Sequence, residues 1–172
     1  MKKNLITAIL VSLTLGVPFL FSNGVAEGGV FCVDTREELQ TALNTSATNG
    51  EADTVQIVQG NYFGNFVYNS SELFGLTIEG GYSAGCSSRT DPPVNTVLDA
   101  NGSGTVLQLS GPLDAIVDGI TLQNGSNSGL VASLGGDFLL SNCKIQYNTG
   151  ENGGGAKLNA QNIELLRQPL II

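Results

Sequence analysis

Apolar positions recur along the second half of the chain with a spacing that fits few folds. The segment VDGITLQNG, residues 117–125, aligns with LSNCKIQYN, residues 140–148, at an offset of 23, which matches Val117 with Leu140. At an offset of 25, Leu140 in turn matches Leu165. A repeat of this length is typical of one coil of a parallel β-solenoid, in which each circuit of the chain stacks on the previous one.

The earlier part of the chain predicts short strands and turns. Runs of alternating apolar residues, such as TVQIVQ (54–59) and TVLQLSG (105–111), end in Gly, Asn or Ser, and no helical pattern separates them. The 23 glycines suit the corners of such coils because glycine adopts positive φ without strain, and asparagine tolerates it. The sequence therefore predicts an all-β fold, a right-handed parallel β-helix, over residues 54–172.

A single amphipathic helix is expected before these strands, within an N-terminal capping segment of residues 27–53. Thr35 followed by Glu38 has the spacing of a capping box. An apolar stripe then follows at Leu39, Ala42 and Leu43. Such a stripe is typical of packing, and we expect this helix to cover the first coil.

The end of the chain, IELLRQPLII, begins a further coil without a polar capping segment. An open last coil exposes strand edges and core residues. We expect the last coil to be incomplete and the chain to be truncated at the C-terminus, a fragment of a longer protein; a partner or a dimer that covers this end is the alternative.

The N-terminus has the features of a secretory signal peptide. Two lysines precede an uncharged apolar run over residues 5–21. We assign residues 1–26 to the signal peptide, with cleavage after Gly24 or Ala26. A membrane anchor is the alternative, but the run is short for a span and Pro18 interrupts it. We therefore expect a mature chain without a membrane span, secreted or on the cell surface of a bacterium.

The net charge of the mature chain bears on which class of partner it can bind. Removing the two lysines of the signal peptide leaves five basic against fifteen acidic residues, a net charge of −10. An acidic surface repels phosphate backbones, so a nucleic acid is not expected as a partner. The sequence does not specify the oligomeric state.

Three cysteines in an exported chain indicate one disulfide and one further thiol. We predict a disulfide between Cys32 and Cys86, both in the N-terminal part. Cys143 falls at an apolar position of a strand, where a free thiol behaves as a small buried hydrophobic group. The segment GYSAGCSSRTDPP, residues 81–93, is predicted to be a loop that leaves the coil and is held by Cys86.

On these features the chain resembles the exported right-handed parallel β-helix proteins of the pectin-lyase-like architecture. IQYNTGENGGGAKL, residues 145–158, is similar to a degenerate repeat of polymorphic outer-membrane proteins, in which Phe-x-x-Asn precedes Gly-Gly-Ala and an aliphatic residue. Asn148, Gly154, Gly155 and Ala156 match that repeat, whereas Ile145 replaces its Phe and Lys157 its aliphatic residue.

The resemblance implies a non-catalytic scaffold that contacts a polysaccharide, a host or another cell surface through its turns. Its enzymatic members imply the alternative, a polysaccharide lyase or glycoside hydrolase. Lyases of this architecture pair Ca²⁺-binding carboxylates with a basic residue, and here only Lys144 and Arg167 lie near the candidate carboxylates. Because Lys144 aligns with Thr121, outward on a strand, the lyase residues do not transfer.

The catalytic candidates are Asp114 and Asp137, which occupy equivalent places at an offset of 23, with Asn162 following at 25. Carboxylates stacked about 5 Å apart have the chemistry to bind Ca²⁺ or to act as the acid and nucleophile of a retaining glycosidase. They also precede strands, where Asp and Asn make side-chain to backbone turns. We favour this turn ladder and expect no cofactor, with Ca²⁺ as the alternative. A Ser-His-Asp triad is excluded because the chain contains no histidine.

The segment DANGSG, residues 99–104, partly matches a calcium-binding loop. Its twelfth position is Ser110, where such a loop requires a bidentate Glu. We therefore predict a turn between two strands.

Overall fold

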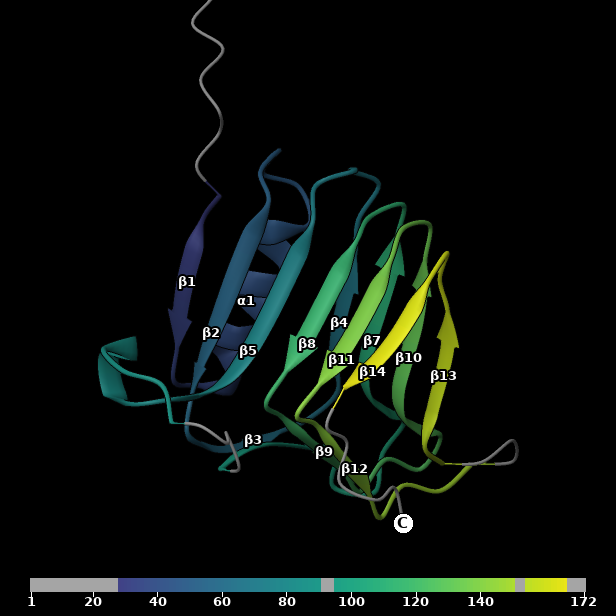
Figure 1. Ribbon diagram of the computed structural model, residues 1–172. Coiled ribbons are helices and arrows are strands. Elements are labelled where there is room, and N and C mark those ends of the chain that lie inside the picture. The colour runs from purple at the N-terminus through teal and green to yellow at the C-terminus, as the bar shows by residue number, and fades with distance from the viewer. Residues whose placement is uncertain (1–27, 91–94, 151–153, 167–172) are drawn as a thin grey trace, which may run out of the picture.

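The computed structural model describes residues 28–90, 95–150 and 154–166, which form three parallel β-sheets and one α-helix (Figure 1). Sheet A has the order β1 (Val30–Val33), β2 (Asp53–Val58), β5 (Leu76–Tyr82), β8 (Ala115–Asp118), β11 (Phe138–Ser141) and β14 (Ile163–Leu166). Sheet B contains β3 (Gly60–Phe63), β6 (Thr96–Asp99), β9 (Thr121–Gln123) and β12 (Lys144–Gln146). Sheet C contains β4 (Phe66–Asn69), β7 (Thr105–Gly111), β10 (Ser128–Leu134) and β13 (Ala156–Asn159). The helical elements are α1 (Arg36–Ser46) and the short 3₁₀ helix η1 (Ala84–Cys86).

From β2 onward the chain visits sheets A, B and C in turn, and each strand pairs in parallel with the strand one circuit later. Val117 lies opposite Leu140 in β8 and β11, and Leu140 lies opposite Leu165 in β14. The predicted offsets of 23 and 25 residues are therefore confirmed as register. The fold is an all-β, parallel, solenoid-like stack.

The core consists of the inward-facing residues of the three sheets. In sheet A, the column Val55, Ile78, Val117 and Leu140 is in register from β2 to β11, and all four side chains are buried. The prediction for Cys143 is also confirmed, since its thiol is free and buried. Burial raises the pKa of this thiol to about 12, so it stays protonated at neutral pH.

The corners between sheets A and B show why the chain alternates strand residues with Gly and Asn. Gly119 follows β8 with φ of 73°, and Asn142, one coil later, has φ of 50°. Asn142 also donates a side-chain hydrogen bond to the Asp118 carboxylate at 2.8 Å. Both of these corners thus use a residue that accepts left-handed backbone, and the amide of Asn142 adds a bond between coils.

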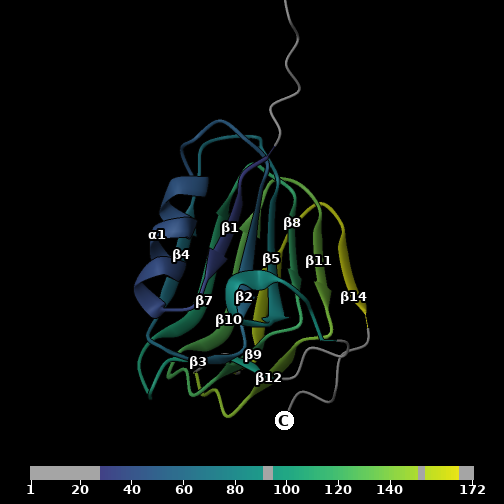
Figure 2. The same cartoon turned by 90° about the vertical axis from the view of Figure 1, so that its left-hand side faces the viewer.

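Helix α1 packs at the N-terminal end of the stack, against β1, β2 and β4 (Figures 1 and 2). The predicted stripe of Leu39, Ala42 and Leu43 is buried. The Thr35 hydroxyl accepts the Glu38 N–H at 3.2 Å, as a helix N-cap does. The second bond differs from a capping box, because the Glu38 carboxylate accepts the N–H of Asp34.

The sheet begins earlier than the sequence pattern indicates. We expected the strands to start at Thr54, but β1 precedes the helix and pairs in parallel with β2. Its four residues are too few to show an alternating pattern of their own.

Some expectations lie outside the described residues, namely the signal peptide at 1–26 and the chain after Leu166. Within the part of the chain that the structure describes, no helix is long and apolar enough to cross a membrane.

Candidate functional site

The three polar residues singled out from the repeat do stack at one corner, before β8, β11 and β14. The Asp114 carboxylate accepts the backbone N–H of Asp137 at 2.7 Å. The Asp137 carboxylate in turn accepts the side-chain N–H of Asn162 at 2.7 Å. Each of the two carboxylates therefore accepts a hydrogen bond from the coil that follows it, which is the geometry of a turn ladder.

A shallow groove of about 260 Å³ lies along this corner, on the outer face of sheet A. Asp114, Asp137 and Asn162 line it together with the apolar side chains of Ile116 and Leu139. An added Cβ at Gly136 would lie 2.2 Å from the Asp114 carboxylate, so the turn closes directly over this carboxylate. The groove gives the two carboxylates a place for a ligand, although one oxygen of each already holds the next coil.

Of the two basic residues considered for lyase chemistry, the structure places only Lys144, and it does not join this corner. Lys144 lies in β12 of sheet B opposite Thr121 and is exposed, as the offset of 23 predicts. Arg167 lies outside the described residues. Within residues 28–90, 95–150 and 154–166, no three Cys, Asp or Glu side chains gather closely enough to hold a metal ion.

A second polar cluster holds the loop that leaves sheet A after β5. Cys32 of β1 and Cys86 of η1 form the predicted disulfide, with their Cα atoms 5.8 Å apart. Because both β1 and η1 also contact β2, this bond ties the first three strands of sheet A and the loop together.

Arg89 connects the same loop to the outer face of sheet A. Its guanidinium forms ion pairs with Glu79 at 3.5 Å and with Asp118, and its Nε donates to the Gly80 carbonyl at 2.8 Å. The guanidinium carbon also lies 5.6 Å from the centre of the Tyr82 ring. A single cation therefore bridges β5 and β8, which are adjacent coils of the stack.

This cluster perturbs the acidity of two of its members. Burial of Asp118 opposes its ionisation, but hydrogen bonds from Ser141, Arg89 and Asn142 and the charge of Arg89 outweigh it, so the pKa of Asp118 is lowered. Burial and the hydrogen bond to Glu79 raise the pKa of Tyr82 to about 12. Asp118 is thus an anion held by donors from three positions, which is typical of a structural ion pair.

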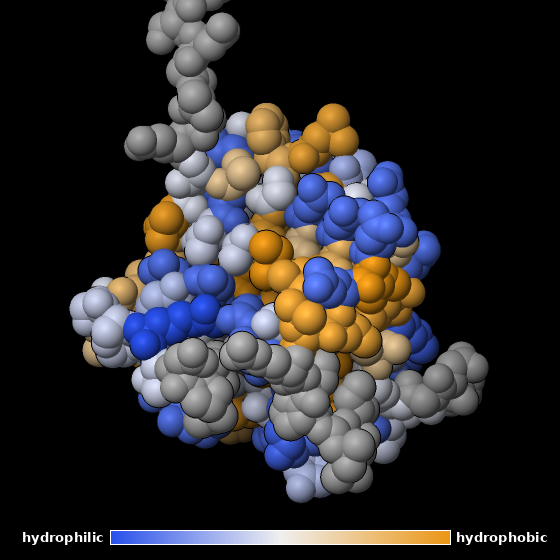
Figure 3. All heavy atoms as spheres, viewed as in Figure 1, coloured by the Kyte–Doolittle hydropathy of each residue, from blue (hydrophilic) through white to orange (hydrophobic). Residues whose placement is uncertain are grey.

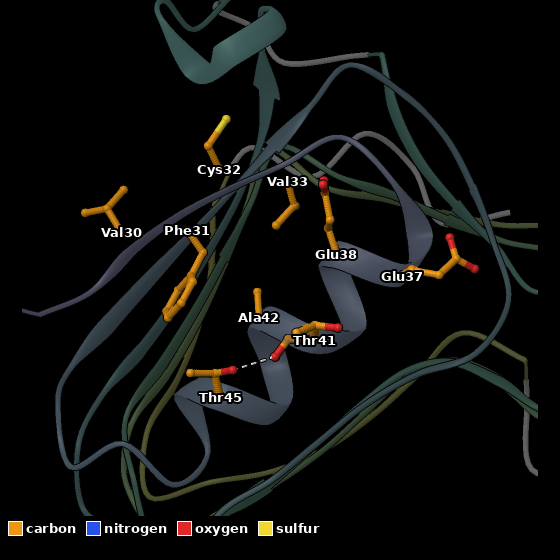
Figure 4. A pocket seen from close by; sticks show the side chains of 9 residues that line it. All are labelled: Val30, Phe31, Cys32, Val33, Glu37, Glu38, Thr41, Ala42 and Thr45. Carbon is orange, nitrogen blue, oxygen red and sulfur yellow. Dashed lines mark hydrogen bonds between the residues drawn. The ribbon is translucent and has the colours of Figure 1, made fainter.

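A third feature is the groove between β1 and α1 at the N-terminal end, with a volume of about 470 Å³. Figure 4 shows Phe31, Val33 and Ala42 directed into the space between strand and helix, while Cys32 points to the opposite side of β1. Glu37 and Glu38 lie at one end of this groove. It is an apolar cleft with an acidic end.

Sequence reasoning missed Arg89 and its partners. The signal was present, because Arg89 is the one cation in the sequence from 81 to 93 and Asp118 ends a run of strand-forming residues. What the sequence did not contain was the path of the loop, which returns across sheet A through an antiparallel bridge between Tyr82 and Arg89.

Comparison with known proteins does not assign the chain to a family. The chain matches no protein-family model, no curated protein and no solved structure. Function must therefore be argued from the arrangement of its own residues.

Proposed function

We propose that this protein is an exported or cell-surface scaffold, a right-handed parallel β-helix of pectin-lyase-like character that contacts glycans or other surfaces without catalysis. The observation that carries the proposal is the corner ladder. Asp114 and Asp137 each use one carboxylate oxygen to accept a hydrogen bond from the following coil, as residues that stabilise turns do. The stack leaves its turns at the surface, where they are free to vary in sequence.

Two further features support export. The sequence begins with a charged and then apolar segment typical of a signal peptide. The disulfide between Cys32 and Cys86 suits an oxidising compartment. A fusion of residues 1–30 to a reporter that is active only outside the cytoplasm tests this part, and an inactive reporter would contradict it.

The rival function is cleavage of a polysaccharide with Asp114 and Asp137 as the carboxylates. It is favoured by one observation, the groove of about 260 Å³ that both residues line. In this alternative the free oxygens of the two side chains act on a sugar bound across β8, β11 and β14, with Ca²⁺ as the ion that carboxylates of this kind bind.

One experiment separates the two functions. The purified chain is incubated with immobilised acidic and neutral polysaccharides, with Ca²⁺ or with a chelator, and both retention of protein and release of shorter saccharides are measured. The scaffold predicts retention without cleavage. Release of products by the wild type, lost in Asp137→Asn, would establish the rival function instead.

A further inference from the structure

Tyr147 occupies a backbone conformation that does not suit it. Its φ is 55°, and its side chain is 68% exposed. The turns that follow β6 and β9 of sheet B contain a residue of the same conformation, and there it is asparagine: Asn101 with φ of 50° and Asn124 with φ of 58°. Since Gln146 lies opposite Gln123, Tyr147 takes the position of Asn124 one coil later.

The neighbours of Tyr147 impose this conformation. The side chain of Gln146 donates to that of Gln123 at 2.9 Å. The side chain of Asn148 accepts the N–H of Gly125 at 2.7 Å and donates to the Leu122 carbonyl at 3.0 Å. The backbone on both sides of Tyr147 is therefore fixed to the previous coil, and the tyrosine ring, which is exposed, is not needed to hold it.

An aromatic residue with positive φ is unusual, whereas asparagine is common there. Strain of this kind persists where the surroundings impose it, and it points to a use for the side chain. An exposed, positioned aromatic ring offers a flat apolar face to a ligand.

The ring borders a groove of about 460 Å³ that follows the stacked turns after β6, β9 and β12. Figures 1 and 2 show β9 and β12 side by side, and residues of the turns after both strands line the groove. The amides of Asn101 and Asn124 and the hydroxyls of Ser126 and Thr149 line the groove. None of the described residues that line it is acidic or basic, although the chain as a whole is acidic.

A buried carboxylate, that of Asp99, holds the turns that contain Asn101 and Asn124. Asp99 accepts one N–H of the Asn124 side chain at 2.8 Å and the backbone N–H of Asn101 at 2.7 Å. A third bond comes from the side chain of Gln123 at 2.8 Å. Asp99 thus fixes which way the Asn124 amide faces, so this amide is preorganised for a ligand.

We propose that this groove binds a neutral saccharide. A sugar ring has an apolar face of C–H groups and an equatorial rim of hydroxyls. The apolar face stacks on Tyr147, and the hydroxyls exchange hydrogen bonds with the amides and hydroxyls of the stacked turns. The described lining contains no cation, which disfavours anionic sugars and phosphates. This inference rests on the proposed scaffold function and specifies the class of glycan and the surface that contacts it.

The test is calorimetric titration of the purified chain with cello-, xylo-, malto- and manno-oligosaccharides. We expect one of these series to bind the wild type. Tyr147→Asn is expected to weaken that binding by about tenfold or more, while Tyr147→Phe stays within about threefold. Because asparagine suits positive φ, Tyr147→Asn is expected to unfold at the same urea concentration as the wild type or a higher one. Weaker binding by this variant would therefore not be due to unfolding.

Two outcomes would overturn the inference. If Tyr147→Asn binds as tightly as the wild type, the saccharide binds at another site. If none of the four series binds the wild type, the ligand of this groove is not a neutral saccharide. Retention on immobilised polysaccharide distinguishes these failures from failure of the scaffold function. If the wild type is retained there but binds no neutral oligosaccharide, the scaffold stands and this groove is not its contact surface.

Discussion

The two ends of the described stack are covered differently. At the N-terminal end, α1 buries its apolar stripe against the first strands, and the side chain of Gln40 accepts the Val67 N–H at 3.1 Å and donates to the Val67 carbonyl at 2.8 Å. At the other end, β14 leaves Ile163, Leu165 and Leu166 exposed, and Figure 3 shows apolar atoms gathered over β11 and β14. Closing a parallel stack therefore requires an apolar cover and, in addition, polar partners for the strand edge.

Replacing one leucine by alanine at each end tests this difference with the same substitution. Leu43 is 0% exposed and Leu165 is 51% exposed. We expect Leu43→Ala to lower the free energy of unfolding by about 2–5 kcal/mol because it leaves a cavity under the helix. Leu165→Ala is expected to lower it by less than about 1 kcal/mol, since half of the side chain is already in water. Urea unfolding measures both, and equal losses would contradict the comparison.

The disulfide should stabilise the N-terminal end alone. It joins residues 54 positions apart, and the variant in which Cys32 and Cys86 are both serine is expected to lose about 2–4 kcal/mol. A reducing agent should destabilise the wild type and leave this variant unchanged. Hydrogen exchange should quicken in β1 and the loop after β5. Equally quickened exchange in β11 and β14 would show that the bond stabilises the whole stack.

The ion pair at Arg89 predicts a dependence on pH. The pKa of Asp118 is lowered in the folded protein, so its contribution is present above the unfolded pKa of about 4 and is lost as pH falls through the lower, folded value. Asp118→Asn should remove about 1 kcal/mol near neutral pH and flatten the acid side of the stability profile. Asp114→Asn, at the corner ladder, is the control. An unchanged profile in Asp118→Asn would contradict the assignment.

A further small effect is expected at the strand edge under the helix. Gln40→Ala removes both hydrogen bonds to Val67 and is expected to lower the free energy of unfolding by about 1 kcal/mol. Thr41→Ala, on the next residue, removes no side-chain hydrogen bond that involves β4 and should be neutral or slightly stabilising. Thermal unfolding of the two variants measures the difference. Equal stabilities would mean that the edge of β4 needs no polar partner.

Sequence reasoning succeeded where one coil repeats the next. The match of Val117 with Leu140 predicted their register, because inward aliphatic residues must recur once per circuit. The helix cap and the disulfide followed from local spacing and from the number of cysteines. It failed at β1, which is too short to show a period, and at Arg89, whose partners depend on a loop path.

The contacts between the turns that follow the strands of sheet B could also not be predicted from the sequence. Asp99 lies opposite Gln123 at an offset of 24, whereas Gln123 lies opposite Gln146 at 23. The repeat offset of 23 aligns Asn101 with Asn124 but misses the pairing of Asp99 with Gln123. The bonds that Asp99 makes to the next coil therefore become apparent only once the stack is built.

Stacking of successive coils is the claim on which the site, the groove and the proposed function all depend. Nuclear Overhauser contacts between backbone protons of isotopically labelled protein test it most directly. The account predicts contacts between residues 117 and 140 and between residues 140 and 165, in the pattern of parallel strands. An antiparallel pattern that joins residues 117–123 to residues 138–146 as a hairpin would contradict it.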